Sequence, residues 1–498
     1  MKTLPLLTLA LVACKSSPEA STANKNGSST TAVLTTGSNT GSAAGSAAGS
    51  STPSPWDNTA VSPDHATAKP APKVVEDPKV IAERALKRIP EIKKHLAELR
   101  NQPFKIDVPA EYQTNKDFRS FVEKEIGKEL GGEKAKAMVE ALVHIGMLKE
   151  SIDLGKAMAD TMVSQAAAYY DPNQKKYFLV MTPSDDNMLD TITAHELTHA
   201  LQDQYFDLSK YLEPNGKKGP ALSDDEINAR KFIVEGEATF AMFAYLLTAK
   251  SGATTLDEKA MAGLRMQLAL TGNLSIDQLR TMSKAQAEAG GSDEMKAAAA
   301  AMDKIPAIIL VPMVDSYLKG ALPIAAAYTK GGWAEVAKLY STPPNSTEQL
   351  LHPDTKLYPT RDWPQTTTLP KQAGTLVESN VVGELGWRVY LEQWGDAKAV
   401  DNAAGWDGDR FAVWRNKDGS LLGLIATAWD TEDDAKAFEA AYRASLVARF
   451  GGDGSKRADG RAVIVVRQGM NVFVVDGSAD AAVQKALTSA KFKEIAHK

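Results

Sequence analysis

Cysteine and clustered basic residues are what this sequence has least of. The 498-residue chain contains one cysteine, Cys14, and no long run of lysine and arginine, and its formal net charge is -5. A chain that binds nucleic acid is expected to carry a basic patch that meets the phosphates. We therefore exclude nucleic acid as a partner. A single cysteine cannot close a disulfide within the chain, so the fold must rely on its apolar core and on any bound metal.

The N-terminus lacks an apolar run long enough to span a bilayer. The stretch Leu4–Ala13 follows an early lysine and is typical of a signal segment. Its last three residues and Cys14 read LVAC (residues 11–14), which resembles the bacterial lipobox. This resemblance implies cleavage before Cys14, a lipid on that cysteine and a place in the bacterial cell envelope; Lys15 at the next position favours the outer membrane. The alternative is an ordinary secretory signal with an incidental buried cysteine.

Large apolar residues are nearly absent from residues 15–76, where serine, threonine, glycine and alanine dominate. Such a composition cannot bury enough surface to offset the entropy cost of ordering the chain. We therefore predict a disordered tether between the signal segment, residues 1–14, and a folded body that begins near residue 77. The whole chain has 43% apolar and 24% charged residues, which is ordinary for globular domains, and its length suggests two or three of them.

The stretch TITAHELTHALQDQYFDL, from Thr191 to Leu208, contains the pattern H-E-x-x-H. Residues four apart on a helix lie on one face, so His195 and His199 can present two imidazole nitrogens to one ion. The chain has seven histidines, and the chance of meeting this pattern anywhere in it is on the order of 0.01. Coincidence is therefore a weak explanation, and the pattern predicts a metal site.

Two histidines leave a catalytic zinc one ligand short, because such a site takes three protein ligands and keeps a fourth position open. The metzincin pattern would require glycine and histidine where this chain has Gln202 and Tyr205, so that class is excluded. The apolar helical stretch 228–247 contains Glu235 and Glu237. A carboxylate in such surroundings is costly to bury ionised unless a cation balances it. One of these two glutamates is expected to complete the site.

At this point the sequence resembles the gluzincin metallopeptidases, the group that includes thermolysin and the zinc aminopeptidases. Their second helix often carries E-G-x-A-x-[FY], which EGEATF at residues 235–240 matches. The resemblance implies that Glu235 is the third ligand of one zinc ion per chain. It leaves Glu237 as a partner of a ligand or as the alternative ligand. Gly236 and Ala238 lack bulk and are expected to let their helix pack closely on the helix that carries the histidines.

A wider resemblance covers about residues 80–480. The segments YYDP, HELTHALQDQYFDL, EGEA and GGW…STEQLLHP, in this order, are similar to a family of uncharacterised exported bacterial and archaeal proteins with predicted zinc-peptidase character. Only the metal motif among these segments specifies a mechanism.

In a centre with two histidines and one glutamate, zinc polarises the scissile carbonyl and acidifies a water molecule. Glu196, next to His195, is placed to take the proton of that water as the general base. A donor for the developing oxyanion is also needed. His352, in the loop-like segment PPNSTEQLLHPDTKLY, is the candidate, and a structural turn is its alternative role. The tyrosines that compete with it are Tyr169, Tyr170, Tyr205 and Tyr245.

The apolar periodicity predicts an α+β fold in two domains. Residues 77–371 are expected to form a mainly helical, zincin-like catalytic domain with a helix over 78–100, a hairpin within 166–181 and the two site helices. Residues 372–498 are expected to form an antiparallel α+β domain with two hairpins and three helices. Thr431 and Asp434 are expected to form a capping box at the start of the second of these helices. His144 lies in an apolar helix and is expected to be a core histidine, and Gly405–Arg410 (GWDGDR) is expected to be a turn.

These observations favour a lipid-anchored zinc metallopeptidase that acts on protein or peptide substrates in the cell envelope. One alternative is a non-catalytic envelope protein that is stabilised by zinc and binds a partner. The intact Glu196 argues against it, because a structural site needs no general base. A zinc hydrolase acting on a non-peptide amide is a further alternative.

Replacement of the cysteine tests the lipid anchor. Cys14→Ser should abolish lipid labelling and membrane retention, because no thiol remains for lipid attachment. The folded body should be unchanged, because the tether separates it from the anchor. Fatty-acid labelling and membrane fractionation measure the two effects. A Cys14→Ser protein that stays in the membrane fraction without lipid would contradict the prediction.

Overall fold

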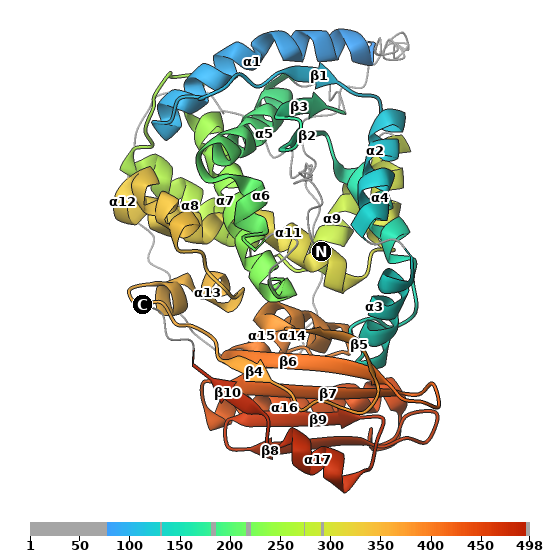
Figure 1. Cartoon of the computed structure of the whole chain (residues 1–498). Coiled ribbons are helices and arrows are strands. Elements are labelled where there is room, and N and C mark those ends of the chain that lie inside the picture. The colour runs from blue at the N-terminus through green and yellow to red at the C-terminus, as the bar shows by residue number, and fades with distance from the viewer. Residues whose placement is uncertain are drawn as a thin grey trace, which may run out of the picture. The chain divides into compact units, whose positions relative to one another are not determined.

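Helices dominate the described part of the chain, and three sheets lie among them (Figure 1). This computed structural model describes residues 77–129, 132–180, 186–215, 221–272, 274–289 and 293–494. The predicted α+β class is confirmed. The predicted signal segment, the lipidation site Cys14 and the tether lie outside the described residues.

The first helix, α1 (Pro78–Arg100), begins where the Asp77 side chain accepts the N–H of Lys79, with proline in the first turn. It ends at Asn101 in the left-handed conformation. Its apolar face, spaced at three and four residues, is buried against α5 (Asp186–Phe206) and a small sheet. The predicted helix over residues 78–100 is confirmed.

The small sheet contains three strands in the order β1-β3-β2. As predicted, β2 (Ala168–Asp171) and β3 (Lys176–Leu179) form an antiparallel hairpin, and β1 (Ala110–Tyr112) pairs with β3 in parallel. The edge strand β2 lies against α5, and all four of its residues are buried. The helices that connect β1 to the hairpin are α2 (Asn115–Glu129), α3 (Glu133–His144) and α4 (Leu154–Gln165).

The helix α7 (Asp224–Thr248) packs against α5 on one side and against α11 (Ala307–Leu318) and α12 (Ala321–Ser341) on another. A capping box starts α7: the Ser223 side chain accepts the N–H of Glu226, whose carboxylate accepts the N–H of Ser223. The main apolar core of the protein forms around this helix.

The position of Gly236 in α7 corrects one expectation. A methyl group built on Gly236 would lie 2.2 Å from the carbonyl carbon of Gly320, in the connection between α11 and α12. This glycine therefore allows two backbones to touch, but the partner is the start of α12 and not the site helix α5. The sequence pattern identified the need for a small residue and assigned it to the wrong neighbour.

Six further elements complete the helical part: α6 (Leu208–Leu212), α8 (Glu258–Gly272), α9 (Ile276–Glu288), α10 (Asp293–Met302), α13 (Glu348–Leu351) and the π-helix η1 (Pro353–Leu357). Among the described residues, the stretch Ala307–Ser341, which comprises α11 and α12, is long and apolar enough to cross a membrane by length and composition alone. Its most apolar window is 56% buried inside the protein, as expected for a core helix. The helix α12 is kinked at Gly331 and Gly332.

The C-terminal part contains a five-stranded sheet in the order β5-β6-β7-β9-β8, antiparallel throughout. Its strands are β5 (Thr375–Asn380), β6 (Trp406–Arg415), β7 (Leu421–Trp429), β8 (Val463–Gln468) and β9 (Asn471–Asp476). Both predicted hairpins, β6–β7 and β8–β9, are confirmed. Two short strands, β4 (Thr366–Thr368) and β10 (Lys491–Lys493), pair separately.

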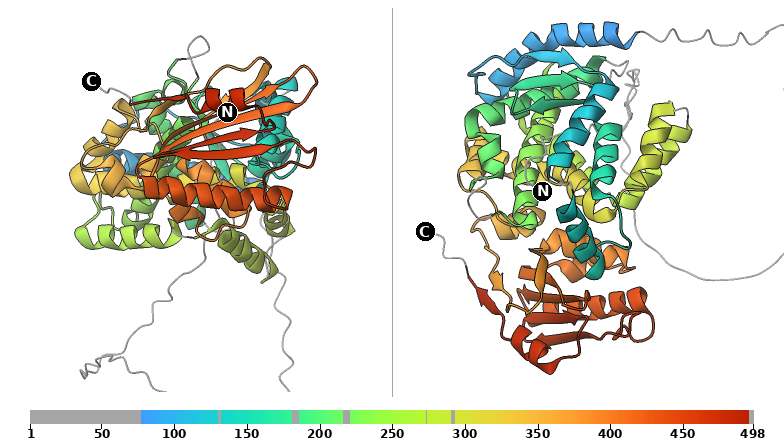
Figure 2. Two further views of the ribbon diagram at one scale, coloured as in Figure 1. Left: turned by 90° about the horizontal axis from the view of Figure 1, so that it is seen from below. Right: turned by 45° about the vertical axis from the view of Figure 1, so that its right-hand side comes forward.

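Helices cover one face of the large sheet: α14 (Gly383–Gln393), α15 (Ala399–Ala403) and α16 (Glu432–Phe450). The left view of Figure 2 shows α16, in dark orange, running along the sheet. The other face packs against α17 (Ala481–Leu487) and the paired short strands. Thr431 caps α16 as predicted, because its side chain accepts the N–H of Asp434.

The segment Gly405–Arg410 has a structural role. It begins strand β6 with a bulge between Trp406 and Gly408, where a simple turn was expected. The buried Asp409 carboxylate accepts the backbone N–H groups of Val382 and Gly383 and the indole N–H groups of Trp387 and Trp406. Four donors on one carboxylate satisfy its hydrogen bonding in the core and fix the start of α14.

The end of α3 joins the two parts of the chain. His144 is 5% exposed and its Nε2 contacts the carbonyl oxygen of Asp476 at 3.2 Å, so the predicted core histidine is confirmed. The carbonyl oxygen of His144 accepts from Arg449 at 2.8 Å and from Arg457 at 3.1 Å. The carbonyl oxygen of Gly146 accepts the indole N–H of Trp394.

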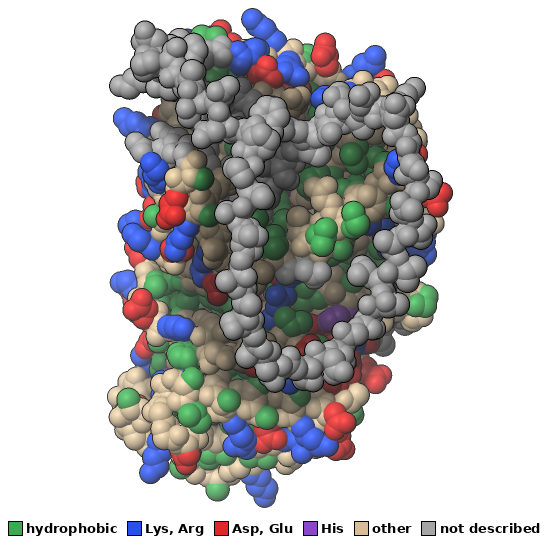
Figure 3. All heavy atoms as spheres, turned by 180° about the vertical axis from the view of Figure 1, so that it is seen from behind, with side chains coloured by type: hydrophobic (Ala, Val, Ile, Leu, Met, Phe, Trp, Pro, Cys, Tyr) green, Lys and Arg blue, Asp and Glu red, His purple; other side chains and the backbone are tan. Residues whose placement is uncertain are grey.

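The surface drawn in Figure 3 carries lysine, arginine, aspartate and glutamate interspersed around its outer parts. Hydrophobic side chains gather toward the hollowed middle of this face.

The contact between Gly236 and Gly320 gives a stability prediction. Gly236→Ala should lower the free energy of unfolding by about 1–3 kcal/mol, because the added methyl group overlaps backbone atoms that cannot move aside easily. Gly263→Ala in α8 is the matched control, since a methyl group there meets nothing within 4 Å. The control should be neutral or stabilising by up to about 1 kcal/mol. Chemical denaturation measures both; equal stability of the two variants would contradict the close backbone contact.

Candidate metal centre

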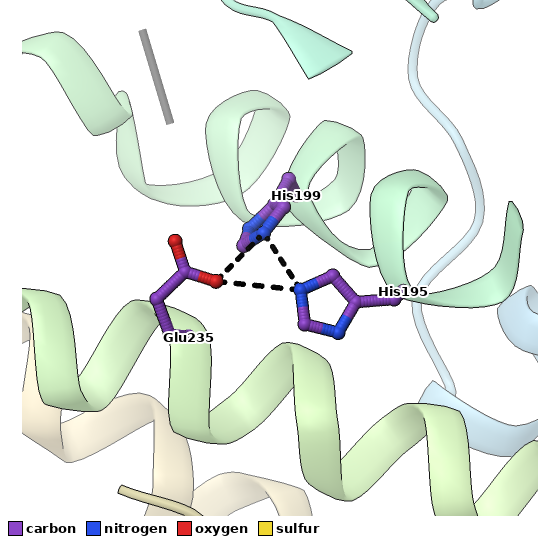
Figure 4. A group of neighbouring side chains, drawn as sticks. All are labelled: His195, His199 and Glu235. Atoms are coloured by element: carbon purple, nitrogen blue, oxygen red, sulfur yellow. Dashed lines mark hydrogen bonds and ion pairs between the residues drawn. The ribbon is translucent and has the colours of Figure 1, made fainter. Parts of the chain in front are cut away.

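Two buried helices bring His195, His199 and Glu235 together (Figure 4). The histidines lie one turn apart on α5, and Glu235 lies on α7, which packs against α5. Figure 4 shows the three side chains pointing toward one another. The exposed fractions of these residues are 2%, 0% and 5%. Among the described residues, this is the group of histidine and carboxylate side chains close enough to share an ion.

The three facing atoms form a nearly equilateral triangle. Nε2 of His195 and Nε2 of His199 are 3.2 Å apart, and each is 3.3 Å from Oε2 of Glu235. Ligand atoms about 2.0 Å from a zinc ion occupy tetrahedral corners about 3.3 Å apart. The three atoms thus have the spacing of one face of such a tetrahedron, so these residues fit a zinc ion. The three residues leave the fourth ligand position of such a tetrahedron open.

The charge of Glu235 also fits a cation. Burial would raise the pKa of Glu235, but the charge of His199 overrides this effect and lowers the pKa to about 2. Burial likewise opposes protonation of His199, but the charge of Glu235 raises its pKa to about 9. Burial lowers the pKa of His195 to about 4. A proton on His199 therefore balances the buried carboxylate, and a bound metal ion would take the place of that proton.

Glu196 is fully buried on the same helix, next to His195. Its Oε2 accepts the backbone N–H of Tyr170 at 2.9 Å, on the edge of β2 that faces away from β3. The hydroxyl of Tyr170 donates to Asp203, and the Lys175 ammonium pairs with the same carboxylate at 2.6 Å. Two residues of α5, Glu196 and Asp203, therefore bind the hairpin.

Glu237 lies behind the triangle. Its carboxylate pairs with the buried Arg100 and accepts the hydroxyl of Tyr340 and the amide N–H of Gln202. The Gln202 oxygen in turn contacts Nδ1 of His199 at 2.8 Å. The structure therefore brings Glu235 to the two histidines and places Glu237 next to Gln202, the partner of the candidate ligand His199. A partner of a ligand was one of the two roles that the sequence left open for Glu237.

His352 lies at the end of α13, about one-third exposed. Its Nε2 contacts Oε1 of Glu384 on α14 at 2.7 Å, and this hydrogen bond is the main cause that raises the pKa of His352. The contact joins α13 to α14, which agrees with the structural role considered for this residue. A role for His352 opposite a substrate oxyanion stays a prediction.

The four competing tyrosines have other partners for their rings and hydroxyls. The hydroxyl groups of Tyr169, Tyr170 and Tyr205 donate to Gln113, Asp203 and the carbonyl oxygen of Pro103. The ring of Tyr245 packs edge-on against His95.

Sequence reasoning missed Tyr317 on α11. Its ring is stacked on His195 with the ring centroids 5.7 Å apart, and the residue is 5% exposed. The surrounding sequence AIILVPMVDSYL is simply an apolar helix with no motif, so only the packing of α11 against α7 reveals this neighbour. Gln202, Arg100 and Tyr340 were missed for the same reason.

Comparisons with known proteins bear on the C-terminal part alone. A family model described as a domain of unknown function, DUF8575, matches residues 371–487. No curated protein and no solved structure matches the chain. The candidate metal centre lies outside the matched region, so the family adds nothing to its chemistry.

Replacement of individual ligands tests the metal centre. Purified full-length protein should bind one zinc ion per chain, and His195→Ala should bind close to none. Glu235→Ala should weaken zinc binding more than Glu237→Ala, because Glu235 lies within the triangle and Glu237 behind it. Metal analysis and competition with a chelating indicator measure these effects. The reverse order of the two glutamate variants would make Glu237 the ligand.

Proposed function

We propose that this protein is a zinc metallopeptidase of gluzincin type that hydrolyses peptide bonds of envelope or extracellular proteins. The observation that carries the proposal is the triangle formed by His195, His199 and Glu235, whose edges of 3.2 and 3.3 Å match a tetrahedral zinc site. A His₂Glu donor set with one corner left open is the arrangement that catalytic zinc sites use.

The residues around the triangle have separable tasks in this proposal. A bound zinc ion would supply Lewis acidity toward a carbonyl oxygen and toward water. Glu196 would take a proton from the attacking water and later deliver it to the leaving amine. The backbone N–H of Tyr170 donates to one oxygen of Glu196 and so restricts the rotation of its carboxylate. Burial of Glu196 strengthens each electrostatic interaction that it makes.

The location of the protein in the proposal rests on the N-terminal sequence. The LVAC segment supports a lipid anchor on Cys14 in the bacterial cell envelope, and Lys15 favours the outer membrane. Substrates would then be proteins or peptides on the far side of the inner membrane.

A second function is favoured by one observation. All three candidate ligands are at most 5% exposed, and every residue of the adjacent edge strand β2 is buried. A substrate must reach a catalytic zinc ion, whereas a structural zinc ion needs no access, so the burial of these residues favours a structural ion. A non-catalytic envelope protein that is stabilised by zinc and binds a partner is therefore the alternative function.

Glu196 decides between the two functions. Glu196→Gln keeps the shape of the side chain and all three candidate ligands, so folding and zinc content should persist. Peptide cleavage should fall by about 10²- to 10⁴-fold, because the general base is lost. The measurement compares initial rates of the two forms on a peptide that the wild-type protein cleaves, at matched zinc occupancy. Equal rates would exclude Glu196 as the base, and no cleavage of a diverse peptide library by the zinc-bound wild type would favour the non-catalytic function.

A further inference from the structure

The amide of Gln202 connects His199 to a buried ion pair. The Gln202 oxygen lies 2.8 Å from Nδ1 of His199, and its nitrogen donates to the carbonyl oxygen of Val234 and to Oε2 of Glu237, both at 2.9 Å. Gln202, His199 and Glu237 have no exposed surface. Each of these hydrogen bonds is therefore made without competition from solvent.

The two acceptors around Gln202 determine how its amide is oriented. A backbone carbonyl and a carboxylate both require a donor, so the NH₂ group of Gln202 must face Val234 and Glu237. The amide oxygen is then left to face His199. An oxygen there requires a hydrogen on Nδ1 of His199, so Nε2, which faces His195 and Glu235, is the ring nitrogen that can give its lone pair to a metal ion.

Glu237 is itself held from two other parts of the chain. Arg100, at the C-terminal end of α1, pairs with its carboxylate, and Tyr340 of α12 donates its hydroxyl. The Arg100 guanidinium lies over the ring of Trp333 at 4.0 Å, and the indole N–H of Trp333 donates to the carbonyl oxygen of Leu99. The orientation of one imidazole thus depends on residues from four helices.

We propose that Gln202 is a positioning residue of the metal centre, and that Glu237 acts on His199 through it. The pair selects the tautomer of His199 in which Nε2 can bind a metal ion, and it prevents the amide from turning its NH₂ group toward the ring. This inference rests on the proposed function, because it assigns the two residues to the same metal centre. Loss of such a partner lowers metal affinity by about 10- to 100-fold.

The test uses three variants of the full-length protein. Gln202→Met keeps the length of the side chain and removes its hydrogen bonds. The double variant Gln202→Glu with Glu237→Gln exchanges the two residue types, so that a carboxylate can accept from His199 and an amide can donate to that carboxylate. Thr198→Val is the matched control, because Thr198 is equally buried beside His199 but donates only to the carbonyl oxygen of Ala194 among the contacts described.

Two readouts separate positioning from packing. Zinc affinity is measured by competition with a chelating indicator. The hydrogen on Nδ1 of His199 is followed by proton–nitrogen NMR of the zinc-loaded protein labelled with ¹⁵N-histidine. We expect Gln202→Met to bind zinc about 10- to 100-fold more weakly and to lose the protected Nδ1–H signal. The double variant should keep this signal and bind zinc within a few-fold of wild type, and Thr198→Val should match wild type in both.

The outcomes distinguish this inference from the proposed function. A double variant that binds zinc no better than Gln202→Met would overturn the positioning role, as would a Gln202→Met protein with the affinity of Thr198→Val. If Gln202→Met fails to fold, the double variant alone decides through its Nδ1–H signal. A wild-type protein that binds no zinc would overturn the metal centre itself, and with it this inference.

Discussion

The burial of carboxylates on the neighbouring helices α5 and α7 is the constraint on which the rest of this structure depends. Glu196, Glu235 and Glu237 are between 0% and 5% exposed, in a region where an ionised group without compensation would cost several kcal/mol. Each is compensated differently: Glu235 by two imidazoles, Glu237 by Arg100 and Glu196 by hydrogen bonding that includes a strand N–H. These contacts hold in place the helices and the strand that supply the partners.

These partners come from distant parts of the sequence. Arg100 ends the first described helix, Tyr170 lies in the hairpin, and Tyr340 lies in the last turns of α12. The polar contacts around the centre therefore fix the relative positions of these segments, because apolar packing is not directional. A catalytic or structural ion at this position would add its binding energy to the same set of contacts.

The sequence predicted the structural features that depend on residues close together along the chain. The helix over 78–100, the hairpin around DPNQ, the cap at Thr431 and the spacing of His195 and His199 all follow from local patterns, and the structure contains each of them. The partners of Glu237 and the neighbour of Gly236 depend on how distant helices pack. The periodicity of a sequence does not predict how distant helices pack. Gln202 was therefore noted only as a departure from the metzincin pattern, and Tyr317 was not predicted as a neighbour of the site.

The contacts at the end of α3 bear on where this chain can be divided. The family model spans residues 371–487, yet the core beneath α14 and α16 includes Ala141, Ile145 and Met147. The backbone carbonyl oxygens of residues 144 and 146 also accept hydrogen bonds from four side chains of the matched region. A fragment cut at the family boundary would expose this apolar surface and leave those donors in water. The region matched by the family model is thus smaller than the region that buries this core, because the core includes residues at the end of α3.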